Sequence, residues 1–387
     1  MRIININIFT VLYQMLNIFS AQHNPEKKKF KNKKFLAGIA KNRLPERINN
    51  LNKLRNKKRV LLLVDMYDWC FYNIASRIQK QLSSKYIIDI LTTVDFYNNI
   101  KEILKNPYDI YLFFYPTGCF ADARKIEYLR KSNKFDKPSK IFFCIYDNYI
   151  WRPDIIVDKR QEHQQKATYI NIDFWLKHSD GYLWGSSQIR DNVYKFFKYI
   201  KPNASCMDGV NSKMFYFKEY SKDILTRDKL RVGWIGNSDI TVSGLQKGYL
   251  EIKQYVTDLS ANFDFCPLDK QIKQIPHDKV PNYIHSIDII VCYSTCEGTP
   301  NQILEGSSCG RCWVSTDVGV VSSVYNTIDN NPTGIIIKKD EESFKSALMK
   351  LYNNRQLIID YGKNGRKAIE KKWDWKYRLE GFDRMFQ

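Results

Sequence analysis

The chain alternates between short apolar runs and longer amphipathic segments. Between the runs, apolar positions recur every three to four residues, as in residues 73–82, which is typical of a helix with one buried face. Such an alternation predicts βαβ units and a parallel sheet. In the first half of the chain the apolar runs cover residues 60–64, 87–91, 108–114, 141–145 and 181–184.

The pattern is interrupted once and then resumes. Residues 212–229 are polar and aromatic without a clear period, as in a linker. We therefore expect an α/β protein with two Rossmann-like domains, which face each other across a ligand cleft at the carboxyl ends of their strands. In the second half the apolar runs cover residues 231–235, 263–265, 287–291, 313–315 and 334–337.

Two carboxylates, Glu297 and Glu305, lie eight positions apart directly after one of these runs. The intervening residues predict a helix start, because Thr299 and Gln302 have the capping-box spacing and Pro300 falls at the first helical position. The free amides of a helix N-terminus bind phosphate groups, and carboxylates accept hydrogen bonds from hydroxyl groups. This arrangement suits a ligand with a diphosphate in the middle and hydroxyl groups at both ends.

Residues 288–319 resemble the donor-site signature of retaining GT-B glycosyltransferases of the family-4 type. The signature consists of Glu297, Glu305, the small-residue stretch 307–310 and the Thr-Asp-x-Gly segment 316–319. Residues 231–237 resemble the first strand and glycine turn of that family's second domain, Lys247 and Gly248 its phosphate-binding lysine segment, and residues 208–211 its interdomain segment. The resemblance extends over residues 59–387.

The resemblance implies a domain organisation and a reaction. We expect a basic N-terminal extension (1–58), an acceptor domain (59–222), a nucleotide-sugar donor domain (223–372) and a C-terminal helix that crosses back to the first domain (373–387). The enzyme would move a sugar from a nucleotide-diphosphate donor to a glycan or lipid-linked acceptor with retention of anomeric configuration. Two alternatives are a sugar-nucleotide epimerase of the same fold and a basic nucleic-acid-binding protein on an inactive transferase scaffold.

The resemblance also implies roles for individual residues. Glu297 would contact the donor sugar and Glu305 the ribose diol, while Lys247 would supply positive charge to the leaving diphosphate. Glu297 and Lys247 are therefore the expected catalytic residues. No cofactor and no metal ion are expected, because the lysine and the helix amides do that work in this fold. The expected donor-binding residues are Gly236, Asn237, Ser238, Lys247, Glu297, Gly298, Thr299, Pro300, Asn301 and Glu305.

The sequence departs from the family pattern at two places. No arginine lies shortly before Lys247, so Asn237 or Ser238 would donate to the phosphates instead. Tyr146 stands where many relatives have a histidine, and it is followed by an aspartate, as in those relatives. The candidate acceptor-side residues are Asp65, Asp68, Trp69, Tyr146 and Asp147. Ordinary turn and packing roles are an equal alternative for the first three.

Charge is concentrated near the N-terminus. The net charge is +20, and residues 25–59 contribute +12 of it, with 14 Lys or Arg against Glu26 and Glu46. Such a segment fits solvated disorder, attraction to anionic lipid headgroups or nucleic-acid binding, although it lacks the aromatic spacing and modules of nucleic-acid-binding proteins. With the apolar but Asn-interrupted residues 3–19, it suggests peripheral contact with an anionic membrane, and an ordinary N-terminal extension is an equal alternative. Nine scattered cysteines favour reduced thiols in the cytoplasm.

Overall fold

The computed structural model describes residues 57–67, 70–105, 107–114, 139–146, 151–154, 159–239 and 244–387. Lys58–Gln387 forms one compact unit that holds all of the described helices and strands. The basic segment and the apolar segment before it therefore lie almost entirely outside the described residues. Among the helices of the described ranges, none is long and apolar enough to cross a membrane.

Six parallel strands form the first sheet, in the order β2-β1-β3-β4-β5-β6. Each of the apolar runs predicted in this half forms one of the strands, with the strand interiors buried because helices cover both faces of a parallel sheet. The short, polar β6 carries no such run and was not predicted. The strands are β1 (Arg59–Val64), β2 (Ile87–Thr92), β3 (Ile110–Phe113), β4 (Lys140–Ile145), β5 (Gly181–Trp184) and β6 (Asn203–Ser205).

Five parallel strands form the second sheet, in the order β11-β10-β9-β7-β8. The chain begins in β7, adds β8 on one side and then returns to add β9 on the other, so β7 and β9 flank the point where the strand order reverses. The two parallel sheets confirm the predicted α/β fold with two Rossmann-like domains. The strands are β7 (Leu230–Gly236), β8 (Phe263–Asp269), β9 (Ile289–Cys292), β10 (Cys312–Thr316) and β11 (Ile335–Ile337).

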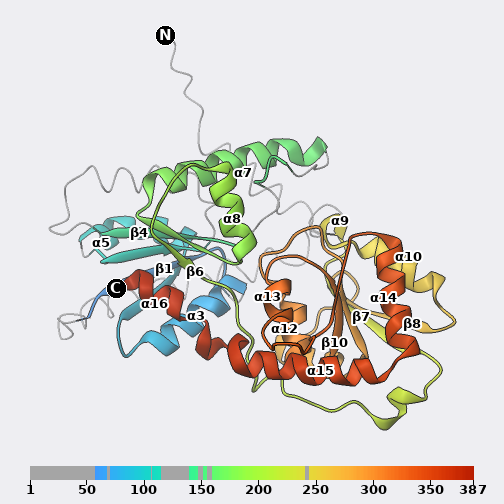
Figure 1. Ribbon diagram of the computed structural model, residues 1–387. Coiled ribbons are helices and arrows are strands. Elements are labelled where there is room, and N and C mark those ends of the chain that lie inside the picture. The colour runs from blue at the N-terminus through green and yellow to red at the C-terminus, as the bar shows by residue number, and fades with distance from the viewer. Residues whose placement is uncertain are drawn as a thin grey trace, which may run out of the picture. The chain divides into compact units, whose positions relative to one another are not determined.

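Helices connect the strands, as Figure 1 shows for both sheets. Those of the first half are α3 (Cys70–Leu82), α4 (Thr93–Asn98), α5 (Ile100–Lys105), α7 (Lys159–His178) and α8 (Ser187–Phe196). Those of the second half are α9 (Gly244–Lys247), α10 (Tyr249–Asp258), α11 (Val280–Ser286), α12 (Asn301–Ser308), α13 (Val321–Tyr325), α14 (Glu341–Asn353), α15 (Gln356–Ala368) and α16 (Glu380–Phe386). Short 3₁₀ turns are η3 (Lys222–Leu225), η4 (His277–Lys279) and η6 (Trp375–Tyr377), and η5 (Ile369–Trp373) is a single π-helical turn.

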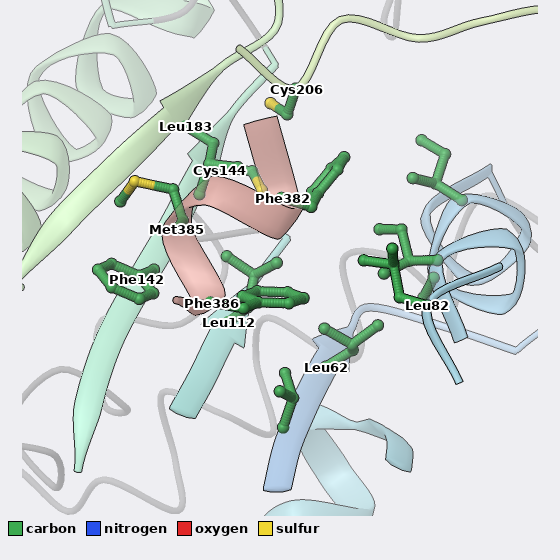
Figure 2. Packing of buried hydrophobic residues seen from close by; sticks show 14 of the residues in the cluster. Leu62, Leu82, Leu112, Phe142, Cys144, Leu183, Cys206, Phe382, Met385 and Phe386 are labelled. Carbon is green, nitrogen blue, oxygen red and sulfur yellow. The ribbon is translucent and has the colours of Figure 1, made fainter. Parts of the chain in front are cut away.

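The end of the chain completes the core of the first sheet. The buried side chains of α16 lie among those of the strands (Figure 2), and burying one such aromatic or methionine side chain contributes about 1.5–3 kcal/mol. The crossing segment is held at Val210, whose amide donates to the Trp373 carbonyl at 2.9 Å and whose carbonyl accepts from Trp375 at 3.2 Å. The packed residues include Leu62, Leu112, Phe142, Leu183, Phe382, Met385 and Phe386.

Candidate active site

The residues that the sequence analysis singled out converge at the carboxyl ends of β7 and β9. These strands are neighbours in the second sheet, and the strand order reverses between them. In open α/β sheets, ligands bind at such a switch point because the loops that follow the two strands diverge and leave a crevice. Lys247 follows β7, and Glu297 follows β9.

Lys247 and Glu297 form a direct ion pair. The Lys247 Nζ lies 2.7 Å from the Glu297 Oε1, and the Ser294 hydroxyl donates to the same oxygen at 2.8 Å. Burial alone would lower the pKa of Lys247, but the Glu297 carboxylate outweighs it and raises that pKa. The lysine therefore carries its charge at neutral pH. An ammonium has three donors, and this pair uses one of them.

Local hydrogen bonds hold the two partners in place. The side-chain amide of Gln246 donates to the Cys296 carbonyl at 2.7 Å, and the Thr295 amide donates to the Gln246 carbonyl at 2.8 Å. The helix that carries Lys247 is thereby tied at two points to the loop that carries Glu297. Gly248 follows with φ of 64°, a left-handed conformation that glycine adopts without a steric penalty.

Glu305 has a different partner, which the sequence analysis missed. Its Oε1 lies 2.9 Å from the His277 Nε2, and the His277 ring packs against Phe215 with centroids 5.3 Å apart. The hydrogen bond to Glu305 raises the pKa of His277 above its usual value, against an opposing effect of burial. Glu305 is largely buried, with 15% of its side chain exposed, whereas 56% of the His277 side chain is exposed.

Gly298 is required by the protein itself. A Cβ at this position would overlap the Tyr146 carbonyl oxygen, which is backbone and cannot rotate away. A Cβ at Gly319, which has φ of 59°, would likewise overlap the Gly298 carbonyl oxygen. Glycine at position 298 therefore has a structural reason, which is the close approach of the backbone that follows β4 of the first sheet.

The predicted capping box at Thr299 is wrong. Helix α12 begins at Asn301 with Pro300 as its N-cap and has no side-chain cap. The Thr299 hydroxyl donates instead to the Gly185 carbonyl at 3.3 Å, and the Gln302 side chain accepts from the Ile235 amide at 3.2 Å. Both side chains bond to segments distant in sequence, which the local spacing could not reveal. The helix ends at Ser308, with Cys309 as its C-cap, and Gly310 follows with φ of 78°.

A buried aspartate, Asp208, contacts Asn301 at the start of this helix. Asp208 is 7% exposed, and burial raises its pKa to about 7 although a hydrogen bond from Asn301 opposes the shift. Its Oδ1 has no hydrogen-bond partner among the described residues. The sequence analysis assigned this residue to the interdomain segment and not to the site, because its contact with Asn301 arises only in the folded chain.

The glycine turn after β7 is fixed by a second buried aspartate. The Asp269 Oδ1 accepts from the Ser238 amide at 3.1 Å and from the Gln271 amide at 3.0 Å. The Asn237 Oδ1 accepts from the Gln271 side chain at 2.7 Å. Gly236 is the last residue of β7. The hydrogen bonds to Asp269 and Gln271 fix the position of Ser238 and Asn237, which follow it beside the switch point.

The acceptor-side candidates lie in the first half of the chain, and the structure describes two of them, Tyr146 and Asp65. The Tyr146 hydroxyl is buried, and its ring packs against Phe71 at 5.2 Å, so the backbone carbonyl is the part that meets the second half. Asp65 accepts from the Met66 amide at 2.8 Å, and burial raises its pKa. Asp68, Trp69 and Asp147 lie outside the described residues.

The described cysteines are free thiols, and the four in the second half that lie closest in sequence to Glu297, which are Cys292, Cys296, Cys309 and Cys312, are buried. Within the described ranges no group of three or more His, Cys, Asp or Glu side chains could hold a metal ion. Burial raises the pKa of Cys312 and Cys309, which keeps these thiols protonated and poor metal ligands.

Residues 230–354 match the family model described as glycosyl transferases group 1. This range contains Lys247, Glu297 and Glu305. An uncharacterized glycosyltransferase of Methanocaldococcus jannaschii is 26% identical over 110 residues, and that match spans 28% of this chain and 30% of the relative. These similarities support the glycosyltransferase class of enzyme for the second half of the chain.

Solved structures share the fold over most of the chain. Sucrose-phosphate synthase from Thermosynechococcus elongatus has a TM-score of 0.63 at 12% identity, over 85% of this chain and 98% of that one. HepE of Anabaena, solved in complex with UDP-glucose, has a TM-score of 0.58 at 10% identity, over 85% of this chain and 99% of that one. The arrangement of two Rossmann-like sheets is thus that of GT-B glycosyltransferases.

Proposed function

We propose that this protein is a glycosyltransferase that moves a sugar from a nucleotide-diphosphate donor to a glycan or lipid-linked acceptor, with retention of anomeric configuration. The Lys247–Glu297 pair at the switch point of the second sheet is the observation that carries the proposal. A charged lysine beside a carboxylate, between the ends of β7 and β9, is suited to a ligand that joins a diphosphate to a sugar.

The two partners would act on neighbouring parts of the donor. Glu297 accepts hydrogen bonds from the sugar hydroxyls, while the two remaining Lys247 donors bind the diphosphate oxygens. The charge on the diphosphate grows as the glycosidic bond breaks, so Lys247 stabilises the transition state more than the ground state. The amides at the start of α12 contribute a further partial positive charge.

Glu305 would hold the other end of the donor by accepting hydrogen bonds from the ribose diol. A carboxylate has about four lone-pair sites, so the ribose diol would share Glu305 with His277, which already bonds to one of its oxygens. The match of this segment to the group 1 family model supports this role. Because HepE was solved with UDP-glucose, UDP-glucose is the first donor to test.

The decisive experiment combines binding and turnover. The full-length protein is mixed with a panel of UDP-, GDP- and ADP-sugars, and binding is followed by thermal shift and isothermal titration calorimetry. Release of nucleoside diphosphate is then measured with oligosaccharide and lipid-linked acceptors, and the anomeric configuration of the product is determined by proton NMR. A protein that neither binds nor consumes any nucleotide sugar contradicts the proposal, and an inverted product contradicts retention alone.

The proposal also gives the basic N-terminal segment a role in reaching a lipid-linked acceptor. Residues 1–58 would bring the enzyme to anionic membranes through their positive charge, worth about 1 kcal/mol for each basic residue near the surface. Comparing sedimentation of the full chain and a chain lacking residues 1–58 with phosphatidylserine vesicles at low and high salt tests this. Equal sedimentation of the two chains at low salt would contradict membrane recruitment.

A further inference from the structure

A pocket runs along the outer edge of the first sheet, away from the donor residues. Its volume is about 720 Å³, within the usual size of a ligand site, and it is lined by β6, by α8 and by the segment from η6 into α16. Figure 1 labels β6, α8 and α16. None of the residues that line it belongs to the Lys247–Glu297–Glu305 site.

The pocket gathers more positive than negative charge. Arg190 is paired with Asp191 at 2.8 Å, so that these two charges cancel. Lys201 donates to the Ser179 carbonyl at 2.9 Å, and Arg378 donates to the Lys372 carbonyl at 2.8 Å, but a carbonyl oxygen does not neutralise a cation. Arg384 also lines the pocket. No carboxylate within the described ranges forms an ion pair with Lys201, Arg378 or Arg384.

One of these cations, Arg378, is partly buried. Burial lowers the pKa of Arg378 to about 10, with no opposing carboxylate. Its guanidinium also lies 4.2 Å from the centroid of the Trp373 ring, which fixes the orientation of the side chain. The Arg378 Nε and Nη2 both donate to the Lys372 carbonyl. The edge formed by Nη1 and the second Nη2 hydrogen is left for an anion that can accept two parallel hydrogen bonds, such as a carboxylate or a phosphate.

Aromatic side chains form the rest of the wall, and hydrogen bonds hold two of them. The Trp184 indole donates to the Asn203 Oδ1 at 3.0 Å, and the Asn203 side-chain amide donates to the Tyr194 hydroxyl at 2.9 Å. Tyr377 adds a third ring from the opposite element. Rigid aromatic rings with polar edges give a ligand a large contact area at a low cost in conformational entropy.

We propose that this pocket is a second binding site, which takes an acidic saccharide. The acid group would meet the unneutralised cations Arg378, Arg384 and Lys201. The exposed Glu380, which lines the same pocket, would accept hydrogen bonds from sugar hydroxyls. A ligand with phosphate groups alone has no donors for Glu380 and is repelled by it, so the combination favours a ligand that carries both an acid and hydroxyl groups.

The pocket shares its elements with the edge of the donor site. Trp184 precedes Gly185, whose carbonyl accepts from Thr299. Gln188, near the start of α8, donates to the Asp317 carbonyl at 3.2 Å and accepts from the Gly319 amide at 3.0 Å. That the bound saccharide is the distal part of an extended acceptor rests on the proposed function; the binding site itself does not.

Titration calorimetry on the full-length protein, without any nucleotide sugar, tests the site. The probes are trigalacturonic acid, the neutral maltotriose and inorganic tripolyphosphate, all at about 0.15 M salt so that exposed charges are screened beyond about 8 Å. Trigalacturonic acid should bind at least about tenfold more tightly than maltotriose, because only the former offers carboxylates to the guanidinium groups. Equal affinity for the two saccharides overturns the proposal, and so does tighter binding of tripolyphosphate.

Variants separate the pocket from general surface charge. Arg384→Ala should weaken trigalacturonic acid by about tenfold, whereas Lys253→Ala, which removes an exposed charge on α10, should leave it unchanged. Glu380→Gln should weaken the saccharide and strengthen tripolyphosphate. Tyr377→Ala, on η6, provides a second loss-of-binding variant if Arg384→Ala proves unstable by circular dichroism. Equal effects of Arg384→Ala and Lys253→Ala overturn the site, whatever the outcome of the transfer assay.

Discussion

Glu297 and Glu305 lie at the two ends of one loop and helix, and they have different counter-charges. Glu297 is paired with a lysine whose pKa is raised, so this pair stays charged through the neutral range. Glu305 is paired with a histidine that is more than half exposed, and this pair changes its charge as the pH passes through the raised pKa of His277. One end of the site therefore has a permanent positive charge, and the other end has one that titrates.

The difference corresponds to the different tasks proposed for the two ends. Stabilisation of a leaving diphosphate requires a permanent positive charge beside the reacting atoms. Recognition of a ribose diol requires only hydrogen-bond acceptors. When His277 is protonated, it binds the Glu305 carboxylate more strongly, and the carboxylate is then a weaker acceptor for the diol. The predictions below separate the two ends by asking which of them controls turnover, which controls affinity and which responds to pH.

Glu297→Gln should have the largest effect. The amide keeps the shape but loses the charge that orients Lys247 and accepts from the donor sugar, so kcat should fall by about 100- to 1,000-fold. Affinity for the nucleoside diphosphate, measured by calorimetry, should change little because the proposed partner of Glu297 is the sugar. If affinity and turnover fell in the same proportion, the assignments of the two glutamates would have to be exchanged.

Lys247→Ala should lower kcat by about 100-fold, with a smaller change in the affinity for the nucleotide sugar, because the charge that it stabilises develops in the transition state. Lys345→Ala is the matched control for loss of one positive charge, because this lysine on α14 is paired with carboxylates and is 24% exposed, as Lys247 is. Combining Lys247→Ala with Glu297→Gln should cost less than the sum of the single effects, since the pair acts as a unit. Strict additivity would show that the two residues work independently.

Glu305→Ala should weaken nucleoside diphosphate binding by about 1.5–3 kcal/mol, or roughly 10- to 150-fold in Kd, because a charged acceptor is removed from two hydroxyl groups. Saturated turnover should change much less than it does in Glu297→Gln. Calorimetry with a nucleoside diphosphate and with its 2′-deoxy form measures the effect. The wild type should distinguish these ligands and the variant should not; an unchanged Kd would remove the ribose role.

His277→Asn should have the smallest effect and should appear mainly as a change in pH dependence. The folded pKa of His277 is raised above 6.5, so its ion pair with Glu305 is fully formed below about pH 6.5 and is lost as pH rises through the folded value. Protonated His277 competes with the ribose diol for Glu305, and an exposed pair of this kind contributes about 0–1 kcal/mol. Acidification from pH 8 to pH 6 should therefore weaken nucleotide binding more in the wild type than in His277→Asn. Parallel pH profiles would contradict the competition.

The sequence predicted most of the fold and the place of Glu297 after a buried strand. Apolar runs such as residues 60–64 and 141–145 form buried strands. A strand of a parallel sheet is covered by helices on both faces, so its side chains on both sides are apolar. The loop after β9 was recognisable for the same local reason, since a buried run followed directly by Glu297 places that carboxylate at a strand's carboxyl end. Strand β6 was missed because three polar residues carry no periodic signal.

Other features depended on contacts between distant segments. Lys247 and Glu297 are 50 positions apart, and His277 and Glu305 are 28 apart, so neither pairing leaves a pattern in any short window. The capping box at Thr299 failed because the Gly185 carbonyl offers its hydroxyl another partner. Tyr146 could be aligned with a functional position, but only packing against Phe71 shows that its hydroxyl is buried.

By itself, the sequence determined which segments are strands and helices, that the two sheets are parallel, and that two carboxylates flank a helix start at the end of a buried strand. These properties follow from local periodicity and chain order. The tertiary structure decided the counter-charge of each carboxylate, the backbone contact that requires glycine at position 298, the desolvation of Asp208 and the docking of α16 onto the first sheet. Those properties depend on distances of a few ångströms between side chains from different elements, and such distances are set only when the whole core packs.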